Sequence, residues 1–594
     1  MAFWDWLIIG GYLVTAVVIG AYFTKKASQS TTDFFLAGRS LPWFIAGTSM
    51  VATTFSAETP ILVSGLTRGT GIFENWFWWS GAIGGAATVF YFARLWRRTE
   101  VLTDIEFITK RYEASAPNNA LRLFKVLYYG LMGNCLGIAT ITVAMTKIIS
   151  NVIDLPEGPL FTLPIIGIDV PAITIILVVL GLTALAYSSL SGMYGIVYTD
   201  LLQFTLAMVG SISLAVIAYV KASGGDGLMA NLQAARGFDP HLLNFVPDLS
   251  VMNIATFTFF VYLFVAWWSN APGDGPYVQR ILSCKTEKDS LLAYLWFNLC
   301  HFIIRPWPWI IVAIISLIYL PDLQDPETAF PAMIRELLPV GLKGVMVAAM
   351  LAAFMSTLDT LLNWGTSYLV NDLYQPYIVK NASSKHYVVA SRVGMLVMAI
   401  VALLVASQLE SIVGVAKYWM VIIGPLGTVM IARWYWWRVN PWSEISAMAA
   451  SLIFGNLLTT MGTISTKLAW ISEEEWLPLR ILIAMVSVTL SWVVVTLLTS
   501  REPCAQTIVF YRKMRIGGPG WKKIAQITDV QPIKGELKNN TIAWISCVTF
   551  IYSLLFGTGY FLFHNWSRGG ICLGVSIVSG FVLAKMIGKM KFSD

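Results

Sequence analysis

The sequence predicts an all-helical membrane protein that crosses the bilayer many times. Of its 594 residues, 57% are hydrophobic and only 12% are charged, whereas about 25% are charged in soluble domains. The mean hydropathy is +0.68. A bilayer core takes about 20 apolar residues per helix, and such segments recur along the whole chain without an intervening soluble domain. The net charge of +7 therefore indicates cytoplasmic loops rather than nucleic-acid binding.

The candidate spans are spread along the whole chain. About fifteen segments are long and apolar enough, and they start near residues 4, 42, 73, 120, 172, 194, 251, 290, 342, 387, 412, 443, 479, 541 and 568. The first, residues 1–23, has no basic leading region and no small-residue cleavage site, so we expect a retained helix rather than a signal peptide. The six cysteines are scattered without a CxxC pair, which favours neither a disulfide framework nor a zinc site.

Basic residues gather in one set of alternate loops. These loops are residues 25–39, 94–111, 280–288, 380–385, 433–438, 501–538 and 585–591, and the acidic loops are residues 154–157, 322–327 and 473–475. Because cytoplasmic loops carry the excess of Lys and Arg, we expect the N-terminus outside and the C-terminus in the cytoplasm. This arrangement requires an odd number of spans, which fifteen satisfies. The expected location is the plasma (inner) membrane.

Two of the apolar spans are interrupted by polar residues and proline. The second span, residues 41–66, contains "TTFSAETP" at 53–60, and the seventh contains "AWWSNAPGDGPYVQR" at 266–280. A single interruption is compatible with a proline kink whose polar groups are satisfied by neighbouring helices. Two interruptions five spans apart predict a transporter built from inverted repeats, with spans two to six in one repeat and seven to eleven in the other. Free carbonyl groups at such interruptions suit a cation.

The predicted repeats divide the chain into four parts. Residues 1–24 form an extra N-terminal helix, residues 41–220 and 251–438 form the two five-helix repeats, and residues 443–594 form the C-terminal helices. The basic segment 500–540 lies within the last part and is too short for a domain of its own. Interrupted backbone at membrane depth is tolerated only where it is buried or lines a wet cavity, so we expect both interruptions to meet inside the protein.

Three stretches resemble the sodium:solute symporter family. They are "DFFLAGRSLPWFIAG" at 33–47, "SGMYGIVYTDLLQF" at 191–204 and "GLKGVMVAAMLAAFMSTLDTLLNWGTSYLVNDLY" at 341–374, and the resemblance covers roughly residues 5–440. It implies a LeuT-like fold, that is, a 5+5 inverted repeat, with one extra helix before it and about four after it.

The resemblance also implies a sodium site between the second and ninth spans. Its ligands would be two carbonyl groups at the interruption, and a carbonyl and two adjacent hydroxyls on the ninth span: Ala52, Phe55, Ala353, Ser356 and Thr357. Sodium is a hard cation that prefers several oxygen ligands. Without the resemblance, a Ser-Thr pair in a membrane helix more often makes a plain interhelical hydrogen bond.

Asp200, in "YTDLLQF", is an ionisable residue near the start of the sixth span. Such residues are functional by default in a membrane, and the resemblance places it on the inner side of the sodium site, where it assists release of the ion. The alternative is a structural pair with an Arg or Lys near the cytoplasmic end.

The solute pocket implied by the resemblance lies beside both interruptions. The candidates by position are Thr54, Glu58, Thr59, Ser80, Trp267, Asn270, Asp274, His301, Arg305 and Lys417. The family's sugar binders carry a carboxylate at the position of Phe77, and they differ again in the region of residues 267–270. Its sialic-acid binder has an Arg on the fourth span, whereas residues 130–145 contain none. The chain therefore departs from both patterns.

Arg305 lies in the middle of the eighth span, with His301 one turn earlier. A charge at this depth costs at least about 2.5 kcal/mol unless it faces a partner or water. Either Arg305 pairs with Asp274 or Glu58 and holds a broken helix, or it binds a carboxylate of the solute. Lys417, near the start of the eleventh span, either faces the solute or extends to the outer interface.

Together these features predict sodium-coupled import of a small organic solute by alternating access, with a carboxylate-bearing solute as one candidate. The alternatives are a sugar-type sodium symporter and an uncoupled uniporter or channel-like protein. An enzyme is not expected, because the chain shows neither metal-ligand spacing nor a nucleophile–base pair. We expect no cofactor and no metal besides Na⁺ as the coupling ion. The expected partners are the solute, Na⁺ and the lipid bilayer but no nucleic acid, and the expected functional unit is a monomer.

Overall fold

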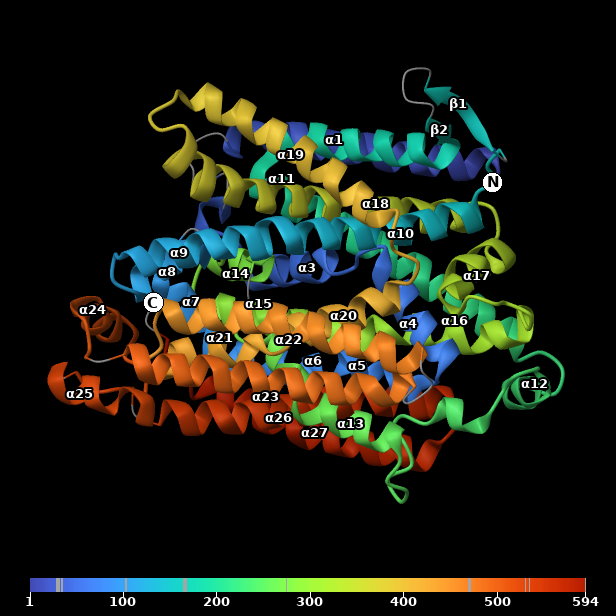
Figure 1. Ribbon diagram of the computed structural model, residues 1–594. Helices are drawn as coiled ribbons and strands as arrows, with labels where there is room; N and C mark the ends of the chain where they lie inside the picture. Colours follow the sequence, from blue (N-terminus) through green and yellow to red (C-terminus); the bar gives the residue numbers. More distant parts are fainter. Residues whose placement is uncertain are drawn as a thin grey trace.

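The computed structural model describes residues 1–592 apart from 28–32, 34–35, 102–103, 157, 164–167, 274, 468–471, 501, 529 and 534. Most helices run side by side in one direction or its reverse, and the two termini lie at opposite ends of these helices (Figure 1). A chain with an odd number of membrane spans has its termini on opposite sides, so this placement is compatible with the predicted odd number. The basic helices α24 (Ala505–Met514) and α25 (Lys522–Thr528) lie at the same end as the C-terminus (Figure 1).

The helices up to residue 222 contain the first predicted repeat. They are α1 (Phe3–Ala27), α3 (Trp43–Thr53), α4 (Glu58–Gly69), α5 (Trp76–Trp79), α6 (Gly81–Ala87), η3 (Thr88–Phe92), α7 (Ala93–Thr99), α9 (Ala116–Lys125), η4 (Val126–Gly133), α10 (Asn134–Val152) and α11 (Ala172–Ala222). The segments predicted to start near 172 and 194 both fall within α11, where residues 172–183 and 193–222 are its apolar parts.

The helices from residue 254 to 435 contain the second predicted repeat. They are α13 (Ile254–Phe264), η6 (Ala266–Asn270), α14 (Gly275–Ser283), α15 (Glu287–Leu299), η7 (Cys300–Ile304), α16 (Pro306–Tyr319), α18 (Leu342–Tyr368), η9 (Leu369–Ile378), α19 (Ser384–Ala406), α20 (Ile412–Ile423) and α21 (Leu426–Tyr435).

The remaining elements follow the second repeat or connect the long helices. The C-terminal membrane helices are α22 (Pro441–Lys467), α23 (Glu473–Thr499), α26 (Glu536–Leu562) and α27 (Trp566–Gly588). The connecting elements are η1 (Ala37–Arg39), η2 (Ile72–Asn75), α8 (Asp104–Arg111), α12 (Leu228–Ala234), η5 (Pro240–Leu243), η8 (Pro326–Thr328), α17 (Ala329–Leu337), η10 (Pro519–Trp521) and the antiparallel pair β1 (Pro159–Leu163) and β2 (Ile168–Pro171).

Within the described residues, nine helices are long and apolar enough to cross a membrane, or up to eleven if two bent pairs each count as one span. The predicted count of about fifteen is not confirmed by this measure. The reason is local: several predicted spans are divided into short helices. The third span, for example, is made of α5, α6, η3 and α7 in succession over residues 76–99.

Both predicted helix interruptions are present. Between α3 and α4 the chain leaves the helix at Thr54 and re-enters it at Glu58. The second interruption separates α13 and η6 from α14, and the two parts are bent by 56°. Gly275 has a φ of 44°, and a Cβ atom there would lie 2.8 Å from the Trp364 ring. Glycine is therefore required at this position both for its backbone conformation and for the close approach of α18.

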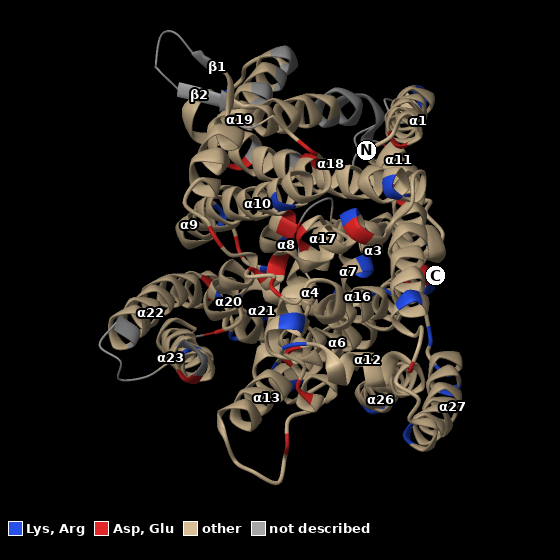
Figure 2. Ribbon diagram, turned by 90° about the vertical axis from the view of Figure 1, so that its right-hand side faces the viewer, with Lys and Arg blue, Asp and Glu red and all other residues tan. Residues whose placement is uncertain are grey.

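The exterior of the bundle is apolar, as a membrane protein requires. Large hydrophobic side chains are exposed on many of the long helices. Viewed along the helices, most of the ribbon carries no charge, and several Lys, Arg, Asp and Glu residues appear around α3, α7 and α8 (Figure 2). Hydrogen bonds hold helix α26 against the core. Trp544 donates to the Ile83 carbonyl (2.9 Å), Tyr552 to the Trp79 carbonyl (2.8 Å), and Trp307 to the Leu555 carbonyl (3.0 Å).

Candidate ion and solute site at the broken helices

A buried carboxylate joins four helices at the centre of the bundle. Asp200, on α11, is 0% exposed. It accepts a hydrogen bond of 2.6 Å from Ser49 Oγ on α3 and one of 3.1 Å from Ser356 Oγ on α18. Arg280, on α14, approaches the same carboxylate to 3.5 Å and also donates from Nε to Ser49 Oγ at 2.9 Å. The Asp200 cluster, meaning these four residues, therefore connects the first half of one broken helix to the second half of the other.

The predicted sodium ligands lie next to this cluster. Ser356 is one of them, and Ala353, one turn earlier on α18, accepts a 2.9 Å hydrogen bond from Thr357 Oγ1. Ala52 is one turn beyond Ser49 on α3, and its carbonyl accepts from the Phe55 amide at 2.9 Å. The segments of α3 and α18 that carry these residues are in contact and, apart from the half-buried Thr357, all five predicted ligands are buried.

The structure also realises the second interpretation of Asp200, a pair with a basic residue. Arg280 is that residue, although its position in the sequence suggested only a return to the cytoplasmic face. It is 1% exposed, and burial of a charge in a membrane helix requires such a partner. Ser49 and the role of Arg280 were missed. The available signal was the single Arg followed by the apolar "ILSC" in α14.

Arg305 holds the first broken helix. Its Nη1 donates to the Val51 carbonyl at 3.1 Å and to Thr54 Oγ1 at 2.7 Å, and its Nη2 donates to the Thr54 carbonyl at 2.7 Å. The side chain is 0% exposed. The last carbonyl groups of a helix lack partners within it and carry partial negative charge. The guanidinium therefore serves as a cap for the C-terminal end of α3.

His301 completes this arrangement. Its Nδ1 lies 3.0 Å from Nη1 of Arg305. The same Nδ1 lies 3.3 Å from Thr54 Oγ1, so His301 contacts both Arg305 and Thr54. Of the two acidic partners predicted for Arg305, Asp274 lies outside the described residues. The Glu58 carboxylate accepts a hydrogen bond of 2.8 Å from Ser56 Oγ. The partners that the structure gives Arg305 are backbone carbonyls, a hydroxyl and an imidazole, which a search for opposite charges does not find.

The remaining pocket candidates form two groups. Thr59 belongs with Arg305, because its hydroxyl donates to the Thr54 carbonyl at 3.1 Å. Trp267 and Asn270 of η6 lie against the glycine face of α6, where a Cβ atom at Gly84 would overlap the Trp267 carbonyl oxygen. The Ser80 hydroxyl is buried and donates to a carbonyl of its own helix.

Aromatic rings connect these two groups. The Trp78 ring packs edge-to-face against the His301 ring, with ring centroids 5.5 Å apart, and stacks on the Phe302 ring, with ring centroids 5.7 Å apart. A Cβ atom at Gly81 would lie 3.0 Å from Nδ2 of Asn270 and 3.3 Å from the Phe302 ring. Lys417 is half-buried on α20. Among the described residues, it makes no hydrogen bond or ring contact with either group.

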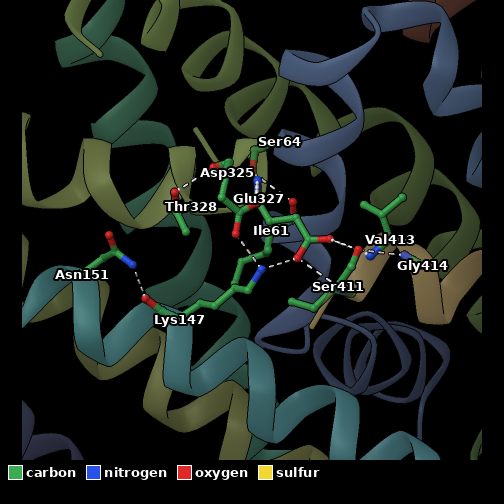
Figure 3. Close-up of polar contacts among 11 residues, drawn as sticks. Ile61, Ser64, Lys147, Asn151, Asp325, Glu327, Thr328, Ser411, Val413 and Gly414 are labelled. Atoms are coloured by element: carbon green, nitrogen blue, oxygen red, sulfur yellow. Dashed lines mark hydrogen bonds and ion pairs between the residues drawn. The ribbon is translucent and has the colours of Figure 1, made fainter. Parts of the chain in front are cut away.

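A second polar cluster lies at the start of α20 (Figure 3). The Glu327 carboxylate accepts hydrogen bonds from the Ser411 hydroxyl (2.7 Å) and from the amides of Ile412 (3.1 Å) and Val413 (2.8 Å). Lys147 on α10 pairs with Glu327 at 2.6 Å and with Asp325 at 2.8 Å. Glu327 is 5% exposed. This Glu327 cluster caps the N-terminus of α20 and connects it to α10.

Two interrupted helices that meet inside a helical bundle are typical of secondary transporters. The sequence pattern of the sodium:solute symporter family matches residues 34–453. The chain belongs to this family. The family and the relatives below are transporters rather than enzymes, and the family supports Na⁺ as the coupling ion.

The relatives and solved structures that the chain resembles agree with this assignment. A "Sodium/glucose cotransporter" of Vibrio parahaemolyticus is 27% identical over 78% of this chain and 86% of its own. A "High-affinity proline transporter PutP" of Bacillus subtilis is 26% identical over 72% of this chain and 86% of its own. The structure of a Na⁺-coupled sialic acid symporter superposes with a TM-score of 0.61 at 19% identity, covering 85% of this chain and 99% of that one. The predicted LeuT-like fold is thereby confirmed.

Proposed function

We propose that the protein is a symporter that imports a small organic solute together with Na⁺ by alternating access. The observation that carries the proposal is the Asp200 cluster, in which one carboxylate connects α3 and α18 through Ser49 and Ser356. Sodium would bind beside it to the oxygens of Ala52, Phe55, Ala353, Ser356 and Thr357. Because the Ser356 hydroxyl donates its proton to Asp200, its lone pairs remain available to a hard cation.

Asp200 and Arg280 would form the inner end of the ion's path. The carboxylate attracts an ion that leaves the Ser356 side, and the Arg280 guanidinium keeps the cluster from retaining it by neutralising the carboxylate at 3.5 Å. One Na⁺ moving through about 100 mV supplies about 2.3 kcal/mol, which corresponds to roughly fifty-fold accumulation of solute before the sodium gradient is added.

Sodium binding tests the proposal without knowledge of the solute. Purified full-length protein should bind radioactive Na⁺ saturably, and Ser356→Ala should weaken that binding at least about tenfold, because one of five oxygen ligands is lost. Ser367→Ala is the matched control, since Ser367 lies on the same helix and donates to the Trp364 carbonyl (2.7 Å). Equal sodium affinities for Ser356→Ala and Ser367→Ala would argue against this sodium site.

For the solute we propose a small carboxylate-bearing compound, with a sugar as the alternative. Lys417 on α20 supports the former, because the Arg305 guanidinium is already occupied by the α3 carbonyls. The relatives named for glucose and for proline represent the two classes. A thermal-shift screen in Na⁺ with L-proline, D-glucose and myo-inositol distinguishes them. A shift with proline that Lys417→Gln abolishes supports the carboxylate, and a shift with glucose alone refutes it.

We also propose that the symporter functions as a monomer in the plasma (inner) membrane, with its N-terminus outside and its C-terminus in the cytoplasm. The distribution of Lys and Arg supports this orientation. The position of the termini at opposite ends of the helices is compatible with it (Figure 1).

A further inference from the structure

We propose that Arg305 is the resident cation of the first broken helix. Its guanidinium permanently occupies one side of the C-terminal end of α3. Exchangeable sodium is thereby confined to the other side, which faces α18. This inference rests on the proposed sodium coupling and adds a residue that sets how many ions the break can hold.

The carbonyl groups at the C-terminal end of α3 accept hydrogen bonds both from their own segment and from Arg305. The Val51 carbonyl accepts from the Phe55 amide (2.9 Å) and from the Thr54 hydroxyl (2.9 Å). The Thr54 carbonyl has left the helix and receives the Thr59 hydroxyl at 3.1 Å. Both carbonyls in addition receive the guanidinium of Arg305, at 3.1 and 2.7 Å.

The partners of the guanidinium are those a metal cation would select. Its oxygen partners are two carbonyl oxygens and the hydroxyl oxygen of Thr54, all neutral and all at the C-terminal end of α3. Hard cations such as sodium are bound by the same types of oxygen. The rings of Phe55 and Trp309 lie 5.3 and 5.2 Å from the guanidinium carbon, within the range of cation–π attraction. An Arg side chain stays protonated in such a site.

The position of the guanidinium is fixed by the local structure of its own helix. η7 is a π-helical turn that ends where the Arg305 amide donates to the Cys300 carbonyl at 3.1 Å. Such turns insert a residue and redirect the side chains that follow. Pro306 begins α16 directly afterwards, and Nδ1 of His301 lies 3.0 Å from Nη1. Nε of Arg305 has no partner among the described residues, so the terminal nitrogens alone make the contacts.

The two cation positions use different carbonyls of the same terminus. Arg305 binds the carbonyl groups of Val51 and Thr54. The carbonyl groups proposed for sodium belong to the residues that follow them, Ala52 and Phe55. Val51 and Ala52 are successive residues of α3 and lie about 100° apart around its axis, and Thr54 and Phe55 lie beyond its last residue, Thr53. When sodium leaves, the guanidinium remains and still compensates the negative end of α3. Removing it creates a vacant oxygen site that a free cation can enter.

The number of sodium ions bound tests this inference. Saturation binding of radioactive Na⁺ to the purified full-length protein should show one more ion per protein for Arg305→Gln than for the wild type. Arg305→Lys keeps a charge at the position and should retain the wild-type number. Arg335→Gln is the control for loss of an Arg, because Arg335 makes an exposed pair with Asp154 (2.6 Å).

The outcomes separate the inference from the proposed function. If the wild type binds no sodium, the proposed coupling fails. If the wild type binds sodium, and Arg305→Gln binds the same number of sodium ions with unchanged affinity, only the resident-cation inference is overturned.

A second variant covers the case in which Arg305→Gln does not fold. Arg305→Ala leaves room for a free guanidinium ion, so millimolar guanidinium should raise its melting temperature by several degrees and leave the wild type unchanged. Tetramethylammonium at the same concentration is the control, since it cannot donate hydrogen bonds. Equal effects of the two ions, or no effect of either, would overturn the inference.

Discussion

At the scale of single residues, the account depends on charges that are buried but not alone. Asp200 is surrounded by the hydroxyls of Ser49 and Ser356 and by Arg280. Arg305 is surrounded by carbonyls and a hydroxyl. In the first group the cation neutralises a side chain, and in the second it neutralises the end of a helix. The two cations therefore have different consequences when they are removed.

Removal of Arg280 should be more harmful than removal of both members of the pair. Arg280→Gln leaves the Asp200 carboxylate buried without its cation, which typically costs about 3–5 kcal/mol. Asp200→Asn together with Arg280→Gln removes both charges, and we expect the double variant to melt at a higher temperature than Arg280→Gln alone. Thermal unfolding of the purified variants measures this, and additive losses would contradict the pairing.

At the scale of elements, the interruptions of α3–α4 and of α13–α14 place unpaired backbone groups inside the bundle. Each is compensated by a residue from another element. Arg305, between η7 and α16, donates to the Thr54 carbonyl, and Trp96 of α7 donates to the Pro272 carbonyl (3.0 Å). The N-terminus of α20 is compensated in the same way by Glu327, from the loop element η8 (Figure 3). The broken helices are therefore positioned by contacts between elements and not by their own sequences.

Loss of the Glu327 cap should destabilise the start of α20. Glu327→Ala removes the acceptor of the Ser411 hydroxyl and of the Ile412 and Val413 amides, and loss of such buried partners costs about 1–3 kcal/mol. We expect a fall of several degrees in the melting temperature. Asp322→Ala is the control, because Asp322 makes an exposed pair with Arg236 (3.0 Å) that should contribute under about 1 kcal/mol. A control that is as destabilised as Glu327→Ala would contradict the capping role.

At the scale of the whole molecule, the sequence predicts the architecture better than the contacts. The interruptions at 53–60 and 266–280 are visible because proline and polar residues break an apolar run. The resemblance to the family predicts Ser356 and Asp200 as site residues. In the structure, Ser356 Oγ lies 3.1 Å from Oδ1 of Asp200. The partners of Arg305 could not be found in this way. They are backbone carbonyls some 250 positions away, and no local period or charge pattern marks a carbonyl. The count of about fifteen spans is unconfirmed for the related reason that local breaks divide them.

Sodium-driven uptake into proteoliposomes tests the central claim most directly. Vesicles containing the full-length protein are given an inward gradient of Na⁺ or of choline, and uptake of labelled L-proline, D-glucose and myo-inositol is followed. The account predicts that at least one of these solutes, or another small carboxylate from the thermal-shift screen, accumulates above its external concentration with Na⁺ only, and that Ser356→Ala abolishes the accumulation. Equal uptake with Na⁺ and choline, unaffected by Ser356→Ala, would contradict it and favour an uncoupled uniporter.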